Sequence, residues 1–353
     1  MAIVRWRVEA EETQQALFAD EELVERHVGS GEFRGMEFLH VNARTVINRV
    51  AGGSRMPFEW TINAYRGCSH ACSYCFARPT HAYLDLGIGE DFDRKIVVKV
   101  NAVERVRAEL ASPRWGGHHI AMGTNTDPYQ RCEGKYHLYQ GILGALVERV
   151  NPFSLLTKST LVLRDLDLLQ AAAAVTDVRV NLSIGTLDEE VWRATEPGTP
   201  HPQRRVEAVR RLNEAGVPCG VLVAPIIPGL SDGEAQLDRV VHAVVAAGAV
   251  GVSSVGLHLK PGTKEVFLER LAQTHPEKVE PLSARYDARA YLPKVDQQEL
   301  AARVRRLVAH HRGSGTSGRR SRFVAGPKGQ GLGPGRDEKA AAPPQAVVQL
   351  PLF

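Results

Sequence analysis

Six short apolar runs, with longer amphipathic stretches between them, constrain the fold of this chain more than any other feature. The runs are TINAY, HHIAMGT, FSLLT, VRVNLSIG, CGVLVAP and VGVSSVGL. Their length predicts buried strands, whereas residues 136–150, 160–174, 202–216 and 233–248 have apolar residues at helical spacing. Strands that alternate with helices form right-handed βαβ units, so the sequence predicts an α/β fold that closes wholly or partly into a barrel. The functional groups of such a barrel gather at the carboxyl ends of its strands.

Three regions are expected along the chain. Residues 1–55 are mixed in polarity and interrupted by glycines, which predicts an N-terminal extension. Residues 56–312 contain the barrel and a C-terminal helical part. Residues 313–353 are rich in Gly, Pro and Ser, with few large apolar side chains, a composition typical of a disordered tail.

Composition narrows the class of protein. The 353 residues are 43% apolar and 24% charged, which suffices for one large buried core, and the formal net charge of +4 does not by itself indicate a nucleic-acid partner. The first residues lack an apolar signal region and no run of eighteen apolar residues occurs, so we expect a cytoplasmic protein without a membrane segment. Five cysteines, an odd number in a chain without a secretory signal, indicate reduced thiols and not a disulfide framework.

Three of the five cysteines form a compact cluster. Cys68, Cys72 and Cys75 are spaced C-x3-C-x2-C directly after the first predicted strand, where one loop brings three thiolates to the same face. Thiolates are soft ligands for iron–sulfur clusters and for zinc. A cubane cluster has four irons to ligate but only three cysteines are local, so one iron is left without a protein thiolate. The alternative is a structural Cys3His zinc site, with His70 or His81 as the fourth ligand.

The cysteine motif and its surroundings resemble a known family. The spacing, together with Tyr74 just before the last cysteine, resembles the signature of the radical SAM superfamily. The segments INAYRGCSHACSYCFARPTH, GTNTDPYQ, LLTKS, LSIG, EPGTP and VAPIIPG resemble its spore photoproduct lyase-like branch, which is related to DNA repair photolyases. The likeness covers residues 57–308. It implies a partial (β/α)6 TIM-like barrel of the radical SAM type, a [4Fe–4S] cluster, and S-adenosyl-L-methionine (SAM), which chelates the open iron and is cleaved reductively to a 5′-deoxyadenosyl radical.

The resemblance also assigns residues to SAM. Tyr74 resembles the residue that packs near the adenine, and Thr126 and Lys158 resemble polar contacts to its methionine or ribose part. Ser183 resembles the ribose-side residue on the fourth strand. The alternative roles are a turn or helix cap for Thr126, a solvated loop charge for Lys158, and a hydrogen-bonded strand hydroxyl for Ser183.

One position departs from the family pattern. Spore photoproduct lyases have a hydrogen-donating cysteine two residues before the Ser or Thr of this loop, and Thr124 stands at that position. A hydroxyl does not replace a thiol, because its O–H bond is too strong to quench a carbon radical, which argues against the thymine-dimer reaction itself. Tyr129 and Cys132 have weaker bonds to hydrogen and are candidate donors, although a free cysteine is more often a small buried residue. Cys219 begins an apolar run and is expected to be inert core.

Two basic stretches were considered as phosphate contacts. One spans 204–211 on a predicted helix and the other spans 303–322. For residues 204–211 the solvated outer face of a helix, balanced by Glu207 and Glu214, is the favoured interpretation. For residues 303–322, phosphate contacts and the solvated outer face of a helix are equally favoured.

The last five residues resemble a docking peptide. Gln349, Leu350, Pro351, Leu352 and Phe353 are similar to the pentapeptide by which bacterial DNA polymerases and repair proteins bind the sliding clamp. Two apolar anchors at the end of a flexible segment suit a shallow hydrophobic groove.

The sequence therefore supports three functional hypotheses. The first is a radical SAM enzyme that acts on nucleic acid in a reaction like DNA repair and that receives electrons from a donor such as flavodoxin or ferredoxin. The second keeps the radical chemistry but directs it to a protein or small-molecule substrate. The third is a non-enzymatic, zinc-stabilised adaptor that binds DNA and the clamp.

Overall fold

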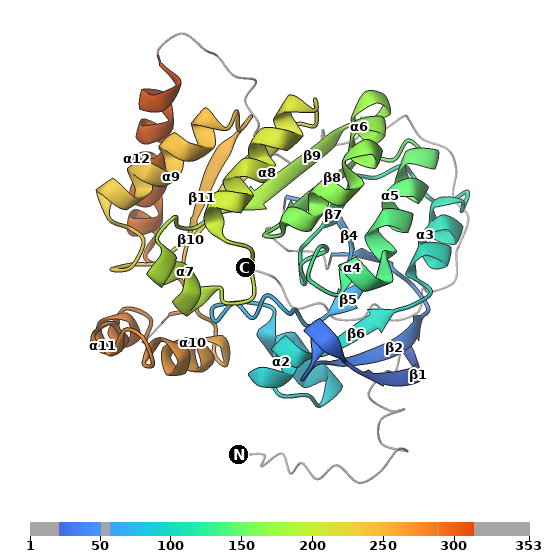
Figure 1. Cartoon of the computed structure of the whole chain (residues 1–353), viewed down its shortest axis with the longest axis horizontal. Helices are drawn as coiled ribbons and strands as arrows, with labels where there is room; N and C mark the ends of the chain where they lie inside the picture. The colour runs from blue at the N-terminus through green and yellow to red at the C-terminus, as the bar shows by residue number, and fades with distance from the viewer. Residues whose placement is uncertain (1–20, 51–56, 288, 314–353) are drawn as a thin grey trace, which may run out of the picture.

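The computed structural model describes residues 21–50, 57–287 and 289–313, and it contains two sheets. Both are visible in Figure 1, the larger one with its helices in the upper part and the smaller one at the lower right. The larger sheet has seven strands in the order β11-β10-β9-β8-β7-β4-β3, and the smaller one has four in the order β1-β2-β6-β5.

Six strands of the larger sheet are parallel and follow one another in chain order. They are β4 Trp60–Ile62, β7 Ile120–Met122, β8 Phe153–Thr157, β9 Val178–Ser183, β10 Cys219–Ile226 and β11 Val252–Gly256. These are the six predicted strands, so the α/β fold is confirmed. Strands β4 and β11 are not paired with each other in the described part of the chain, which leaves an open sheet with the (β/α)6 connectivity expected of a partial barrel.

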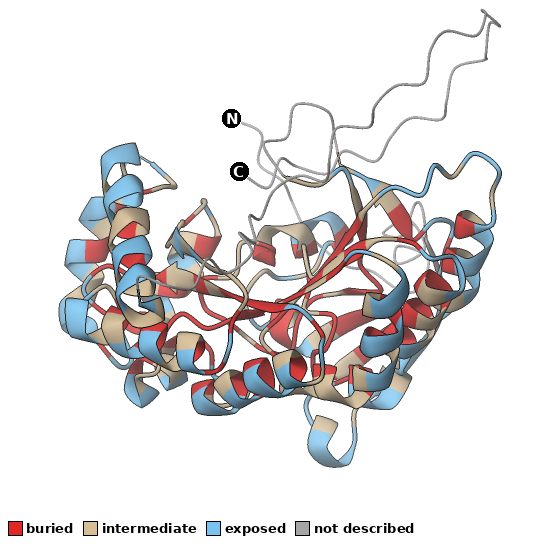
Figure 2. Cartoon of the chain, turned by 90° about the horizontal axis from the view of Figure 1, so that it is seen from above, coloured by how far each residue is buried: buried red, intermediate tan, exposed pale blue. Residues whose placement is uncertain are grey.

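Several of the helices cover the outer face of this sheet (Figure 1). Figure 2 shows the strands largely buried and the outer sides of the helices exposed. The helices are α2 Glu90–Arg94, α3 Ala102–Leu110, α4 Glu133–Tyr136, α5 Leu138–Glu148, α6 Leu166–Val175, α7 Glu189–Thr195, α8 Pro202–Glu214, α9 Glu234–Ala246, α10 Thr263–Leu271, α11 Pro276–Arg285 and α12 Lys294–Arg312, with short 3-10 helices at Gly31–Phe33, Arg78–Leu84 and Thr160–Asp165. Helix α7 begins at Asp188, whose carboxylate accepts bonds from two backbone amides of the first turn.

The inner face of the sheet has small polar side chains beside apolar ones. On β9, Val178, Val180 and Leu182 are buried, whereas Asn181 and Ser183 alternate with them and line a cavity. The alternation leaves open space along the inner face at the carboxyl ends of the strands, where a barrel-type fold places its chemistry.

Residues of the predicted N-terminal extension contribute to both sheets. Strand β1 (Glu21–Val28) pairs with β2 (Glu37–Ala43), which pairs in turn with β6 (Lys95–Lys99) beside β5 (Tyr65–Arg66). Strand β3 (Ile47–Arg49) pairs antiparallel with β4. The predicted boundary at residue 55 falls outside the described residues.

The C-terminal helices close one end of the sheet. Helix α12 packs against β11 and α9; Arg303 donates to the backbone carbonyl of Asp232, and Arg312 donates to that of Ala249. Two of the basic residues predicted as candidate phosphate contacts, Arg303 and Arg312, therefore hold α12 in place. Within the described residues, no helix is both long and apolar enough to cross a membrane.

Candidate active site

The three clustered cysteines lie on one loop that leaves the small sheet at the end of β5. The loop begins at Gly67, whose φ of +78° favours glycine. Its neighbours also leave no room for a side chain, because a Cβ would meet backbone oxygens of Phe92 and Lys95 at 2.9 Å. Thr126 and Gln130 both donate hydrogen bonds to the Gly67 carbonyl, at 2.7 and 3.1 Å. These contacts fix the point from which the cysteines start.

Buried ion pairs hold the rest of the loop. The Arg78 side chain is fully buried; it donates to the Cys72 carbonyl and forms an ion pair with Asp93 at 2.7 Å. Arg270 of α10 reaches the same Asp93 carboxylate and also donates to the Ala71 carbonyl at 3.0 Å. One acidic residue thereby joins two arginines, and both arginines support the cysteine loop.

The three thiols fit a metal cluster. All three are free of disulfides and line the same cavity. Burial raises the pKa of the Cys68 and Cys75 thiols, and burial together with the Glu196 carboxylate raises that of Cys72 to about 12. Thiols in such surroundings stay protonated at neutral pH unless a cation compensates the negative charge of the thiolate. The three cysteines therefore suit iron, whose binding supplies that positive charge.

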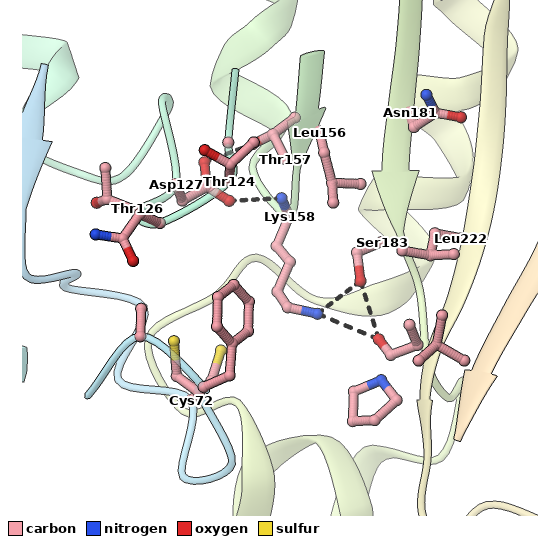
Figure 3. A pocket seen from close by; sticks show the side chains of 18 of the residues that line it. Cys72, Thr124, Thr126, Asp127, Leu156, Thr157, Lys158, Asn181, Ser183 and Leu222 are labelled. Carbon is pink, nitrogen blue, oxygen red and sulfur yellow. Dashed lines mark hydrogen bonds between the residues drawn. The ribbon is translucent and has the colours of Figure 1, made fainter. Parts of the chain in front are cut away.

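The cavity extends from the cysteine loop over the inner face of the sheet and has a volume of about 470 Å³. Its walls come from strands β7 to β11 and from the segments that follow them. Figure 3 shows Lys158, at the end of β8, extending toward Ser183 at the end of β9, with Cys72 on its own loop facing the same space. Of the predicted site residues, the cavity brings together Cys68, Cys72, Tyr74, Cys75, Thr126, Lys158 and Ser183.

Lys158 is held by three oxygen atoms. Its ammonium donates to Ser183 Oγ at 2.7 Å, to Glu196 Oε1 at 3.0 Å and, more weakly, to the Ala224 carbonyl at 3.4 Å. The lysine side chain is 15% exposed. It is thus a partly buried, oriented charge and not a solvated loop residue.

Glu196 lies at the centre of this arrangement, and sequence reasoning did not assign it a role. Its carboxylate accepts bonds from the Tyr74 hydroxyl and from Lys158, and its other oxygen pairs with Arg205 at 2.6 Å. Burial opposes ionisation, but Arg205 and Lys158 lower the pKa of Glu196 to about 2. Glu196 belongs to the EPGTP segment, and the resemblance of that segment to the family is the sequence signal that could have identified this residue.

Arg205 corrects one expectation for the basic stretch at 204–211. That stretch was assigned to a solvated helix face, and Arg210 indeed pairs with Glu207 and Glu214 on the surface. Arg205, however, is 1% exposed and bonds to Glu196 and to the Ser183 carbonyl. Helical spacing places it on the inner side of α8, one residue away from the exposed Arg204.

Thr126 and Asp127 connect the β7 loop to its neighbours. The Thr126 hydroxyl donates to Gly67 and accepts a bond from Gln130 at 3.0 Å, so its polar capacity is used within the protein. Asp127 accepts bonds from the Thr157 hydroxyl and the Lys158 amide, at 2.6 and 2.7 Å. These bonds set the position from which Lys158 extends.

The candidate hydrogen donors lie outside the cavity. Tyr129 and Cys132 are fully buried, and neither is among the residues that line the cavity. The Tyr129 hydroxyl donates to Asp165 at 2.9 Å. Thr124 does line the cavity, and its hydroxyl lies 2.6 Å from that of Thr61. The role of Tyr129 and Cys132 as donors stays a prediction that this arrangement does not support.

The remaining predicted residues are placed as follows. His70 lines the cavity with Nδ1 3.3 Å from the Asp127 carboxylate, whereas His81 is fully buried outside it and its Nε2 lies 3.0 Å from the Lys95 carbonyl. Cys219 is fully buried on β10, and burial raises the pKa of its thiol, as expected of an inert core residue. The clamp-like residues 349–353 lie outside the described residues.

The fold and the site together define a class of protein. Three cysteines on one loop face a cavity at the carboxyl ends of a parallel (β/α)6 sheet, an arrangement suited to an enzyme with an iron–sulfur cluster. The family model of the radical SAM superfamily matches residues 62–241, just over half of the chain. The chain belongs to this superfamily, as the cysteine motif predicted.

Curated relatives share much of the sequence. An uncharacterized protein of Mycobacterium tuberculosis is 45% identical over 290 residues, which cover 82% of this chain and 85% of the relative. An uncharacterized protein of Methanocaldococcus jannaschii is 30% identical over 201 residues, or 56% of this chain and 71% of the relative.

Solved structures share the fold. A spore photoproduct lyase complexed with dinucleoside spore photoproduct has a TM-score of 0.57 and 19% sequence identity, with 78% of this chain and 79% of that chain covered. A variant of the same lyase with bound AdoMet and dinucleoside spore photoproduct also has a TM-score of 0.57. At this identity the likeness concerns the fold.

The cofactors follow from the family. The enzyme uses a [4Fe–4S] cluster and SAM, and the three-thiol loop is the group of residues suited to hold the cluster. Membership of the superfamily excludes the zinc-stabilised, non-enzymatic adaptor.

Proposed function

We propose that this radical SAM enzyme acts on nucleic acid and abstracts a hydrogen atom from a nucleotide. When bound, the cluster supplies the electron that cleaves SAM into methionine and the 5′-deoxyadenosyl radical. The observation that carries the proposal is the shared fold with a spore photoproduct lyase complexed with dinucleoside spore photoproduct, over more than three quarters of both chains.

The residues that line the cavity favour the entry of an uncharged part of the substrate. Among the described residues that line the cavity, Lys158 is the one lysine or arginine, and it is already bound to Glu196. Much of the remaining wall is apolar, including Met122, Leu156 and Leu222. A phosphate would lose its hydration there without gaining a cation, whereas a nucleobase would bury an uncharged planar ring. In the proposed complex the base enters and the phosphates stay outside.

Within the same proposal, Lys158, Ser183 and Tyr74 orient SAM. Lys158 has three N–H donors, and the contact to the Ala224 carbonyl at 3.4 Å is the weakest of its three bonds. Exchanging that bond for the carboxylate of SAM costs little and creates a charge-assisted hydrogen bond. Thr126 acts indirectly, by fixing the cysteine loop through Gly67.

Thymine-dimer repair is not the proposed reaction. Thr124 stands where the resemblance expects a hydrogen-donating thiol, and the two candidate substitutes lie outside the cavity. The substrate class is therefore proposed without a dimer lesion, and a small electron donor such as flavodoxin or ferredoxin is the proposed source of electrons.

The experiment is a turnover assay under anaerobic conditions. The reconstituted enzyme is reduced with dithionite and incubated with SAM, either alone or with single-stranded DNA, duplex DNA, RNA or a mixed peptide pool. We expect 5′-deoxyadenosine above the substrate-free level with a nucleic acid and not with the peptides. Stimulation by the peptides alone would instead support the second hypothesis, and the Cys72→Ala variant provides the background.

A further inference from the structure

The ribbon formed by β1 and β2 brings two histidines and a carboxylate together outside the cavity. Glu25 and His27 lie two residues apart on β1, so their side chains project from the same face, and His40 lies on β2. One ligand atom from each of the three residues lies within 4.8 Å of the other two. In Figure 1 this ribbon is at the edge of the smaller sheet.

A β-bulge creates this alignment. Strands β1 and β2 pair antiparallel, and their register shifts by one residue between Leu23 and Glu25, which places Glu25 opposite His40. An uninterrupted ladder would place Glu25 opposite Leu39. Leu39 belongs to an apolar cluster with Leu84, on the other face of the sheet from His40. The bulge thus directs the carboxylate toward the histidine, as bulges do where a side chain must be re-aimed.

The two histidines contact each other, and each also contacts one further side chain, Glu25 for His27 and Tyr136 for His40. His27 Nε2 lies 2.8 Å from Glu25 Oε2, and the rings of His27 and His40 are 4.3 Å apart between centroids. His40 Nε2 forms a hydrogen bond of 2.7 Å with the Tyr136 hydroxyl. A histidine that ligates a metal through one ring nitrogen is usually oriented by a hydrogen bond from its other ring nitrogen.

Charged groups of both signs lie around the three side chains. Burial, and then the neighbouring His27, lower the pKa of His40. Lys135 is a cation on the facing element; its ammonium lies 5.3 Å from the centre of the Tyr136 ring and adds to the lowering. Glu25 supplies the opposite charge and raises the pKa of His40.

We propose that Glu25, His27 and His40 form a zinc site that is separate from the iron–sulfur cluster. Two imidazoles and one carboxylate are ligands that zinc prefers, and a partly exposed His2Glu set leaves the fourth position to water. The ligands come from both strands, so the ion joins β1 to β2.

This site lies in line with the strand that leads to the cysteine loop. His40 pairs with Val98 of β6, and Val98 pairs with Tyr65 of β5, three residues before Cys68. An ion that fixes the outer ribbon therefore stabilises the small sheet from which the loop begins. We expect zinc to raise the melting temperature of the protein without changing the rate of SAM cleavage.

The test uses the full-length protein with its cluster already assembled. Zinc is titrated calorimetrically in metal-free buffer, zinc and iron are then counted by mass spectrometry, and the visible spectrum of the cluster is followed throughout. We expect one zinc per chain with an unchanged cluster spectrum. Glu25→Gln and His27→Gln should each weaken zinc binding by about 100-fold or more, because outer contacts alone are worth about 10- to 100-fold.

Matched variants separate this site from adventitious binding. Glu104→Gln removes an exposed carboxylate on α3 and should leave zinc affinity unchanged, whereas Tyr136→Phe should weaken it about tenfold through the orientation of His40. Absence of zinc binding by the parent protein overturns the proposal. So does zinc uptake that persists in Glu25→Gln and His27→Gln, or that bleaches the cluster.

Discussion

At the scale of single residues, the site depends on how Glu196 distributes two positive charges. Its carboxylate holds Arg205 on one side and Lys158 and Tyr74 on the other. With two cations and one anion, the group keeps one net positive charge beside the cavity. Glu196 itself does not line the cavity, so it acts by positioning the residues that do.

Replacing Glu196 with Gln tests this positioning role. The amide keeps the shape but loses the charge, so Lys158 and Tyr74 lose their shared anionic acceptor, and we expect SAM affinity to fall by about tenfold to hundredfold. Calorimetry on the cluster-loaded protein measures the affinity, and iron content should stay unchanged. The exposed Glu207→Gln variant is the control. A fall in iron content equal to the fall in affinity would instead indicate a general structural role.

A second residue-scale prediction concerns Lys158. The Lys158→Ala change removes the oriented ammonium and leaves the cysteine loop untouched, so SAM binding should weaken while the cluster spectrum stays intact. The loss of a bond to a charged group corresponds to about tenfold or more in affinity. Lys260→Ala, a lysine that does not line the cavity, provides the comparison. Unchanged affinity in Lys158→Ala would remove this residue from the SAM site.

Sequence reasoning reached the residues whose spacing or strand position is visible, and it missed those whose role depends on packing. The three cysteines and Lys158 follow predicted strands and Ser183 lies near the end of one, where a barrel gathers its chemistry. Glu196 and Arg205 come from a loop and a helix after β9, and only the fold brings them together. Helical spacing groups Arg205 with the buried Ala208, Val209 and Leu212, but an arginine is normally expected on the exposed face of a helix.

At the scale of elements, α10 holds the cysteine loop from a distance of almost two hundred residues in sequence. Arg270 reaches Asp93 and the Ala71 carbonyl, and Thr263 at the start of α10 donates to the Cys75 carbonyl. The C-terminal helical part is therefore a component of the cluster site.

Arg270→Ala should release this support. Two contacts of a charged group are lost, and because Arg270 is partly exposed each counts at the low end of the usual range, so the cost is about 3 kcal/mol. We therefore expect a lower melting temperature and less iron retained after desalting. Arg285→Ala, which removes an exposed pair with Asp296, is the matched control. If both variants retain iron equally well, α10 is not needed to hold the loop.

The core elements were predictable because their apolar runs are buried on both faces or alternate clearly. Strands β1, β2 and β3 were not predicted, because β1 in particular has an exposed side and carries charged residues between its apolar ones. Their assignment depends on the pairing of β2 with β6, which are far apart in sequence, and on the antiparallel pairing of β3 with β4.

At the scale of the whole molecule, the fold is compatible with nucleic acid and with other substrates. The last residues bear on that choice independently of the cavity. Gln349, Leu350, Leu352 and Phe353 match the clamp-docking pattern, and a linker rich in Gly and Pro separates them from α12. We propose that this peptide brings the enzyme to DNA that carries a sliding clamp.

Deleting Leu352 and Phe353 tests the proposal without touching the catalytic core. The two apolar anchors supply most of the area that a shallow groove can bury, so their removal should abolish capture of the protein by an immobilised bacterial sliding clamp. Iron content and SAM cleavage should be the same in both proteins, because neither residue is near the cysteines in sequence. A control that replaces Lys339 with Ala, also in the tail, should still be captured. If the full-length chain is not captured at all, the docking proposal fails, and the turnover assay alone then decides whether the substrate is nucleic acid.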